Sequence, residues 1–74
     1  MHVIVVGCGR VGAAVARELV DGGHEVVVID KRHESLNRLG AEFAGRTMVG
    51  VGFDRDLLTA AGITPESGVM AVTS

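Results

Sequence analysis

The 74-residue chain has no tyrosine or tryptophan, one cysteine and one proline, and its two phenylalanines make the aromatic share 3%. A single cysteine excludes a disulfide within the chain and a cysteine-rich zinc site. The scarcity of aromatic rings disfavours a stacking platform for single-stranded nucleic acid. Seven basic against nine acidic residues give a formal charge of −2, which provides no basic stripe for a phosphate backbone or an anionic membrane. We therefore expect no binding to nucleic acid.

Long hydrophobic runs are also absent. The longest, at residues 3–6 and 26–29, are far shorter than the roughly 20 residues of a membrane-spanning helix, so we expect no direct insertion into a membrane. No basic leader and cleavage site frame the run that begins near Met1, so we expect no signal peptide. These features predict a soluble, cytoplasmic chain with room for one small domain.

The apolar residues, 47% of the chain, predict four strands and three helices in alternation. Continuous β-branched runs at 2–6 and 25–29 indicate buried strands, and shorter runs at 47–51 and 69–72 indicate two more. Helices are predicted over residues 10–21, from about Glu34, and after Asp54 as N-cap up to Gly62. Helical spacing predicts their apolar faces. These faces carry Val11, Ala14, Val15 and Leu19, then Leu36, Leu39 and Phe43, and finally Leu57, Leu58 and Ala61.

Strands that alternate with helices predict a Rossmann-like α/β fold, a doubly wound parallel sheet in strand order 3-2-1-4. The fourth strand would lie at the sheet edge, where only Thr73 and Ser74 follow it. Its apolar face and backbone donors would then lack cover. We therefore expect residues 1–74 to form a single, truncated nucleotide-binding domain, or to be covered by a second copy.

A glycine-rich loop links the first strand to the first helix. Residues 7–12 fit the pattern G-x-G-x-x-G in the strand–loop–helix context that dinucleotide binding requires. Gly7 would permit the tight turn, Gly9 would let a pyrophosphate approach the backbone, and Gly12 would let helix and strand pack closely. The amides and dipole at the helix N-terminus favour phosphate. A turn without a ligand is the alternative. Cys8 is either a thiolate activated by the helix or, more simply, a small side chain that fits.

An acidic residue stands where a ribose would need one. Asp30 lies 18 residues after Gly12, at the end of the second strand. Its carboxylate would repel a 2′-phosphate and so favour NAD(H) over NADP(H), a preference that Lys31 and Arg32 would weaken. The ribose diol also occurs in ATP and ADP, so both ligand classes stay open. Arg10 would neutralise phosphate charge, either that of a γ-phosphate or that of a ligand across a dimer interface. The alternative is an arginine solvated at the surface.

No catalytic or metal-binding constellation is evident. His2, His24 and His33 lack metal-ligand spacing, and no Ser/His/Asp set or carboxylate pair can be assembled. We therefore expect the chain not to be an enzyme. The N-terminal half of an NAD-dependent dehydrogenase remains an alternative, because such enzymes often carry their acid–base residue on a later domain.

Three segments resemble the TrkA-N or RCK (regulator of K⁺ conductance) family. They are the glycine loop with Arg10, the stretch 49–63 that ends in Ala-Gly-Ile, and the final run 69–74 with Ala-Val-Thr. Two positions depart from the family pattern. Gly52-Phe53-Asp54 stands where most members have Gly-Asp directly, and Gly68 replaces a usual aspartate.

The resemblance implies a cytosolic regulatory subunit, docked at the inner face of the membrane on a potassium transporter or channel. It implies binding of NAD(H) or ATP/ADP and self-association as a dimer or a ring of domains. A regulatory domain of a cation/proton antiporter is an alternative. The resemblance assigns Gly52 to Asp54 to the adenine side and Thr73 to the cleft floor. The full set of expected nucleotide-binding residues is Gly7, Cys8, Gly9, Arg10, Val11, Gly12, Asp30, Lys31, Gly52, Phe53, Asp54 and Thr73.

Overall fold

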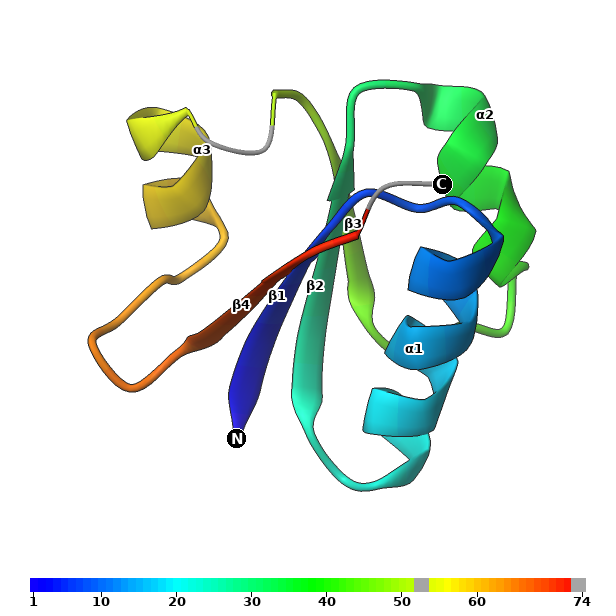
Figure 1. The fold of residues 1–74 in the computed structure, drawn as a ribbon, viewed down its shortest axis with the longest axis horizontal. Coiled ribbons are helices and arrows are strands. Elements are labelled where there is room, and N and C mark those ends of the chain that lie inside the picture. The colour runs from blue at the N-terminus through cyan, green and yellow to red at the C-terminus, as the bar shows by residue number, and fades with distance from the viewer. Residues whose placement is uncertain (52–53, 73–74) are drawn as a thin grey trace.

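Four parallel strands form one sheet: β1 (His2–Val6), β2 (Glu25–Asp30), β3 (Arg46–Val49) and β4 (Gly68–Ala71). The computed structural model describes residues 1–51 and 54–72. The strand order is β3-β2-β1-β4, which confirms the predicted Rossmann-like α/β topology (Figure 1). β3 and β4 are each displaced from the predicted ranges by a residue or two.

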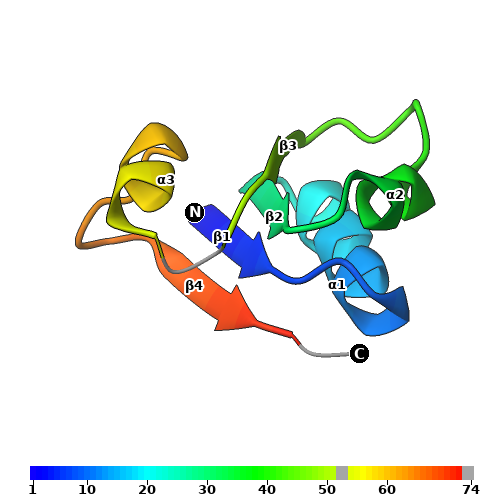
Figure 2. The same ribbon diagram turned by 90° about the horizontal axis from the view of Figure 1, so that it is seen from above.

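Helices cover both faces of this sheet. α1 (Arg10–Asp21) and α2 (His33–Leu36), which continues as the 3₁₀ turn η1 (Asn37–Leu39), lie on one face, and α3 (Arg55–Ala60) lies on the other (Figure 2). The first two crossovers run in the direction β1 to β2 to β3, whereas the third returns past β1 to β4. A right-handed connection places helices on opposite faces when the direction of winding reverses.

The core consists of two apolar layers, one on each face of the sheet. Alternate side chains of a strand point to opposite faces, so a strand with two covered faces is a continuous apolar run. The layer under α1 and α2 contains Val3, Val5, Val26, Val28, Leu36 and Leu39. The layer under α3 contains Ile4, Val27, Ile29 and Ala61.

The predicted apolar face of α1 is partly wrong. The buried residues of the helix are Gly12, Ala13 and Ala16. Val11 is 57% exposed and Ala14 is also exposed, whereas Leu19 packs against the core as predicted. The small side chains face the sheet because they let the helix backbone approach it closely, a packing preference that hydrophobic spacing does not report.

The predicted second helix is too long. α2 and η1 end at Leu39, and Gly40 has φ +80°, a backbone conformation that stops a right-handed helix. Phe43 therefore lies in the connection to β3, although its ring still packs against the core cluster.

β4 lies at one edge of the sheet, as the sequence predicts. Val69 and Met70 are 43% and 39% exposed. α3 ends as predicted, with Ala61 buried beneath it and Gly62 following. Its N-cap is Asp54, whose carboxylate accepts hydrogen bonds from the amides of Asp56 and Leu57 at 2.8 and 3.2 Å.

Candidate functional site

The carboxyl ends of the four strands meet at one edge of the sheet, where the loops are fastened to neighbouring strands. The Gly7 amide donates to the Ile29 carbonyl at 2.7 Å, and the Gly50 amide donates to the Asp30 carbonyl at 2.9 Å. β1 lies between β2 and β4, and the crossover that leaves β1 through α1 lies on the face opposite to the crossover that reaches β4 through α3. Such a switch point is where open α/β sheets bind ligands.

Two glycines of the loop are required by the fold itself. Gly7 has φ +103°, and a Cβ there would lie 2.0 Å from the Val72 carbonyl oxygen. A Cβ on Gly12 would lie 2.2 Å from the Gly7 carbonyl oxygen. The predicted reasons for these two glycines, a tight turn and close packing of helix on strand, are therefore confirmed.

Gly9 is different, because its conformation does not demand glycine. It is the N-cap of α1 with φ −79° and ψ −165°, an extended backbone that any residue adopts. Its carbonyl accepts the first helical bond, from the Ala13 amide at 2.9 Å. No side chain among the described residues caps this helix, and its first turn has no acidic residue. The amides of this turn thus point outward, available to an anion.

Asp30 is joined directly to the glycine loop. Its Oδ2 accepts a hydrogen bond from the Cys8 amide at 2.8 Å, and its Oδ1 accepts one from the Arg32 amide at 2.8 Å. A carboxylate has about four lone-pair sites, so both oxygens keep capacity for a further donor. The structure therefore brings together the predicted loop and the predicted acid, and holds the carboxylate in a fixed orientation.

Cys8 turns its side chain away from this edge. The thiol is fully buried in the core cluster under α1. Burial raises the pKa of the Cys8 thiol, and the nearby Asp30 carboxylate raises it further, against smaller opposite effects of Arg38 and Arg17. The residue is therefore a neutral thiol that fills space, the simpler of the two interpretations, and only its amide faces Asp30.

The other predicted residues divide into three groups. Arg10, Val11 and Lys31 are exposed beside the loop and Asp30. Asp54 also follows a strand of the sheet, but its Oδ1 is already engaged in capping α3. Gly52, Phe53 and Thr73 lie outside the described residues.

Arg32 contributes to the position of Asp30 in a way that the sequence did not predict. Its backbone amide, rather than its side chain, holds Oδ1 of Asp30. An aspartate that accepts from the amide two residues later forms an Asx turn, so an aspartate directly before a chain reversal is the signal that predicts such a bond.

Two further observations bear on the kind of protein. Within residues 1–51 and 54–72, no helix has both the length and the apolar character that crossing a membrane requires. In the same described part of the chain, no three His, Cys, Asp or Glu side chains come together in a way that would hold a metal ion.

Comparison with known proteins identifies relatives over the whole length of the chain. The Trk system potassium uptake protein TrkA of Streptomyces coelicolor is 49% identical over 74 residues, which cover 100% of this chain and 33% of that protein. The TrkA homologs of Pyrococcus abyssi and Pyrococcus horikoshii are 32% and 30% identical over 73 residues, which cover 99% of this chain and 32% of each homolog. The chain thus spans about a third of the length of these relatives.

The family model described as the TrkA-N domain matches residues 3–74. This match covers nearly the entire chain, and it agrees with the resemblance of the glycine loop and of the two later segments. The chain therefore belongs to the TrkA-N domain family.

Proposed function

We propose that the chain binds NAD(H) or ATP/ADP at the carboxyl edge of its sheet, and that this binding regulates potassium uptake through a membrane transporter. The potassium part is supported by the names of the relatives, which are potassium uptake proteins. The nucleotide part is supported by the geometry of the glycine loop and Asp30.

One observation carries the nucleotide proposal: the hydrogen bond of 2.8 Å between the Cys8 amide and Asp30 Oδ2. It fixes the predicted ribose acceptor against the loop whose amides would receive the phosphates. A ribose and the pyrophosphate attached to it lie within a few bonds of one another, so a site for both needs these two elements on one rigid frame.

The residues of the proposed site have different roles. The glycine at position 9 leaves the helix N-terminus without a side chain, and the amides of the first turn bind phosphate. Arg10 adds a positive charge beside them. Asp30 accepts hydrogen bonds from the ribose hydroxyls, and Lys31 lies next to it. Gly52, Phe53 and Asp54 on the adenine side, and Thr73 at the cleft floor, remain proposals that rest on the family resemblance.

The proposed role is regulatory rather than enzymatic. A nucleotide that binds one arrangement of associated domains more tightly than another shifts the population toward that arrangement. This requires self-association, as a dimer or a ring, and contact with a transporter or channel subunit at the cytoplasmic face of the membrane. A dehydrogenase, the rival function, would instead oxidise or reduce a small substrate with bound NAD(H).

Thermal unfolding in the presence of NAD⁺, NADH, NADPH, ATP and ADP tests this proposal. A ligand at 100 times its dissociation constant stabilises the folded state by about 2.7 kcal/mol. For a domain of this size that corresponds to a rise of roughly 10 °C or more in Tm. The shift should vanish in Asp30→Ala and persist in Glu66→Ala, which removes an equal charge from an exposed position between α3 and β4.

The ligand-induced shift is compared within each variant, because Asp30→Ala also weakens the ligand-free fold. A clear unfolding transition that none of the five nucleotides moves would refute nucleotide binding. Turnover of NADH with a small-molecule substrate by the full-length protein would refute the regulatory role and favour a dehydrogenase.

A further inference from the structure

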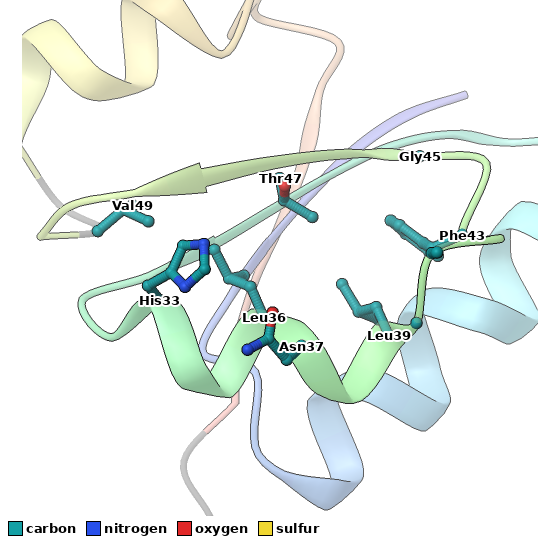
Figure 3. Close-up of a pocket in the computed structure, with 10 residues that line it drawn as sticks. His33, Leu36, Asn37, Leu39, Phe43, Gly45, Thr47 and Val49 are labelled. Atoms are coloured by element: carbon teal, nitrogen blue, oxygen red, sulfur yellow. The ribbon is translucent and has the colours of Figure 1, made fainter.

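A groove runs along the outer edge of β3, on the face of the sheet that α1 and α2 cover. Its volume is about 570 Å³, and its walls are β3 on one side and α2 with η1 on the other (Figure 3). Leu36, Leu39 and Phe43 form its apolar floor, and His33 and Val49 lie at the end nearest Asp30. A volume of this size falls within the range of about 300–1,000 Å³ that is typical of binding pockets.

The open edge of β3 presents backbone hydrogen-bonding groups along this groove. In a parallel ladder, alternate residues of an edge strand bond to the neighbouring strand and the others face away. The Gly50 amide donates to Asp30 of β2, so Arg46 and Met48 share its orientation toward β2. The amides and carbonyls of Thr47 and Val49 therefore point to the open side.

The same two residues, Thr47 and Val49, line the groove with their side chains. The edge thus combines free backbone groups with an apolar cavity between a strand and a helix. Extended peptides bind such edges as an added strand: main-chain hydrogen bonds supply affinity, and alternate side chains enter the adjacent pocket. A small rigid ligand would use the cavity but not the row of backbone groups.

Charge distinguishes between the possible occupants. Residues 31–49, which form both walls, contain four Lys or Arg and two Glu, a formal charge of +2 in a chain whose total is −2. None of the described residues that line the groove is acidic. A second copy pairing edge to edge would bring two such positive segments together, whereas an acidic peptide would complement them.

We propose that the outer edge of β3 and its groove bind an extended, acidic segment of a partner protein, which adds to the sheet next to β3 and places an apolar side chain against Leu36, Leu39 and Phe43. This surface is separate from the nucleotide-binding loop, and the proposal does not depend on nucleotide binding.

A phage-displayed library of random 12-residue peptides, selected on the full-length protein, tests the proposal. The enriched peptides should carry Asp or Glu together with alternating apolar residues. Labelled synthetic copies are then titrated against variants by fluorescence anisotropy. Thr47→Pro removes an outward N–H without breaking the ladder to β2, and an edge strand tolerates proline at such a position. Thr47→Val keeps the N–H and is its matched control.

We expect Thr47→Pro to weaken peptide binding about tenfold or more, the effect of one lost hydrogen bond together with the intruding ring, and Thr47→Val to change it less than about twofold. A second pair tests the charge and does not depend on how well Thr47→Pro folds. Arg46→Glu, on β3, should weaken binding about fivefold, and Arg55→Glu, on α3, should leave it nearly unchanged.

Four results would overturn the proposal. The first is the absence of enriched peptides, and the second is enrichment of basic ones. The third is peptide binding that neither Thr47→Pro nor Arg46→Glu weakens. The fourth is a dimer in sedimentation velocity that Thr47→Pro abolishes, which would assign this edge to a second copy instead.

Discussion

Gly12→Ala tests the account of how α1 is seated on the sheet. The new Cβ would lie 2.2 Å from the Gly7 carbonyl oxygen and 3.1 Å from its carbon. Both atoms are backbone, and Gly7 is itself held by a hydrogen bond of 2.7 Å to Ile29. Neither atom can rotate away as a side chain would, so the helix must lift off the strand or the loop must deform.

The sign of the change in the free energy of unfolding shows whether helix propensity or steric overlap dominates. Alanine in a helix is about 1 kcal/mol more favourable than glycine, which alone would make the variant more stable. Forcing an extra carbon into a close-packed site costs typically about 1–3 kcal/mol, and more where the contacted atoms are backbone. We therefore expect Gly12→Ala to lower the free energy of unfolding by about 2 kcal/mol or more.

Urea unfolding followed by circular dichroism measures this change, with Gly22→Ala as the matched control. Gly22 follows the same helix, has φ −79°, and its new Cβ would meet nothing closer than 3.4 Å. This control should be neutral or more stable by up to about 1 kcal/mol. A Gly12→Ala protein as stable as the original would refute the close approach of α1 to the Gly7 carbonyl.

Three further predictions concern single side chains. Asp54→Ala should destabilise the fold by about 1 kcal/mol through loss of the α3 cap, whereas Asp56→Ala, whose contribution is its amide, should cost much less in the same urea titration. Asp30→Ala should cost about 1–3 kcal/mol without any nucleotide, because it leaves the partly buried Cys8 amide without its acceptor. Above pH 9 the unfolded chain loses its thiol proton while the folded chain, with its raised Cys8 pKa, keeps it. Stability should therefore fall with rising pH, by up to about 1.4 kcal/mol per unit, and Cys8→Ala should remove that slope in unfolding curves between pH 8 and 10.5.

The sequence alone predicts the sheet order, and it predicts that the glycine loop and Asp30 lie at the same edge of the sheet. Continuous Val and Ile runs identify doubly covered strands, and crossover handedness then leaves few arrangements. The position of Asp30 at a strand end follows from the same reasoning. These features can be predicted because they depend on short stretches of sequence and not on how side chains pack.

The sequence-based predictions are wrong where close packing, rather than hydrophobicity, determines which side chains are buried. Val11 and Ala14 fit an apolar helical face, yet Gly12, Ala13 and Ala16 are buried, because the shortest approach to the sheet selects the smallest side chains. The hydrogen bond from the Cys8 amide to Asp30 is likewise not predictable from the sequence. Every residue except proline has a backbone N–H, so the residue type does not indicate which amide will donate.

The groove beside β3 is likewise a feature that the hydrophobic pattern does not predict. The spacing of Leu36, Leu39 and Phe43 predicts one continuous helix. Instead Gly40 ends the helical segment, and Phe43 approaches the core from a loop. Leu39, Gly40 and Phe43 all line the groove, so its wall includes the point where the helical segment ends.

The most direct test of the central claim is calorimetric titration of NADH and of ATP into the original protein and into Gly9→Ala. The φ and ψ of Gly9 are ones that alanine adopts, so we expect the ligand-free fold to persist in circular dichroism, whereas the added methyl group should obstruct the proposed approach of the phosphates. We predict that at least one nucleotide binds the original protein and that Gly9→Ala weakens this binding at least about tenfold, or 1.4 kcal/mol. Equal affinity in both proteins, or no binding to the original, would contradict a phosphate site at this loop.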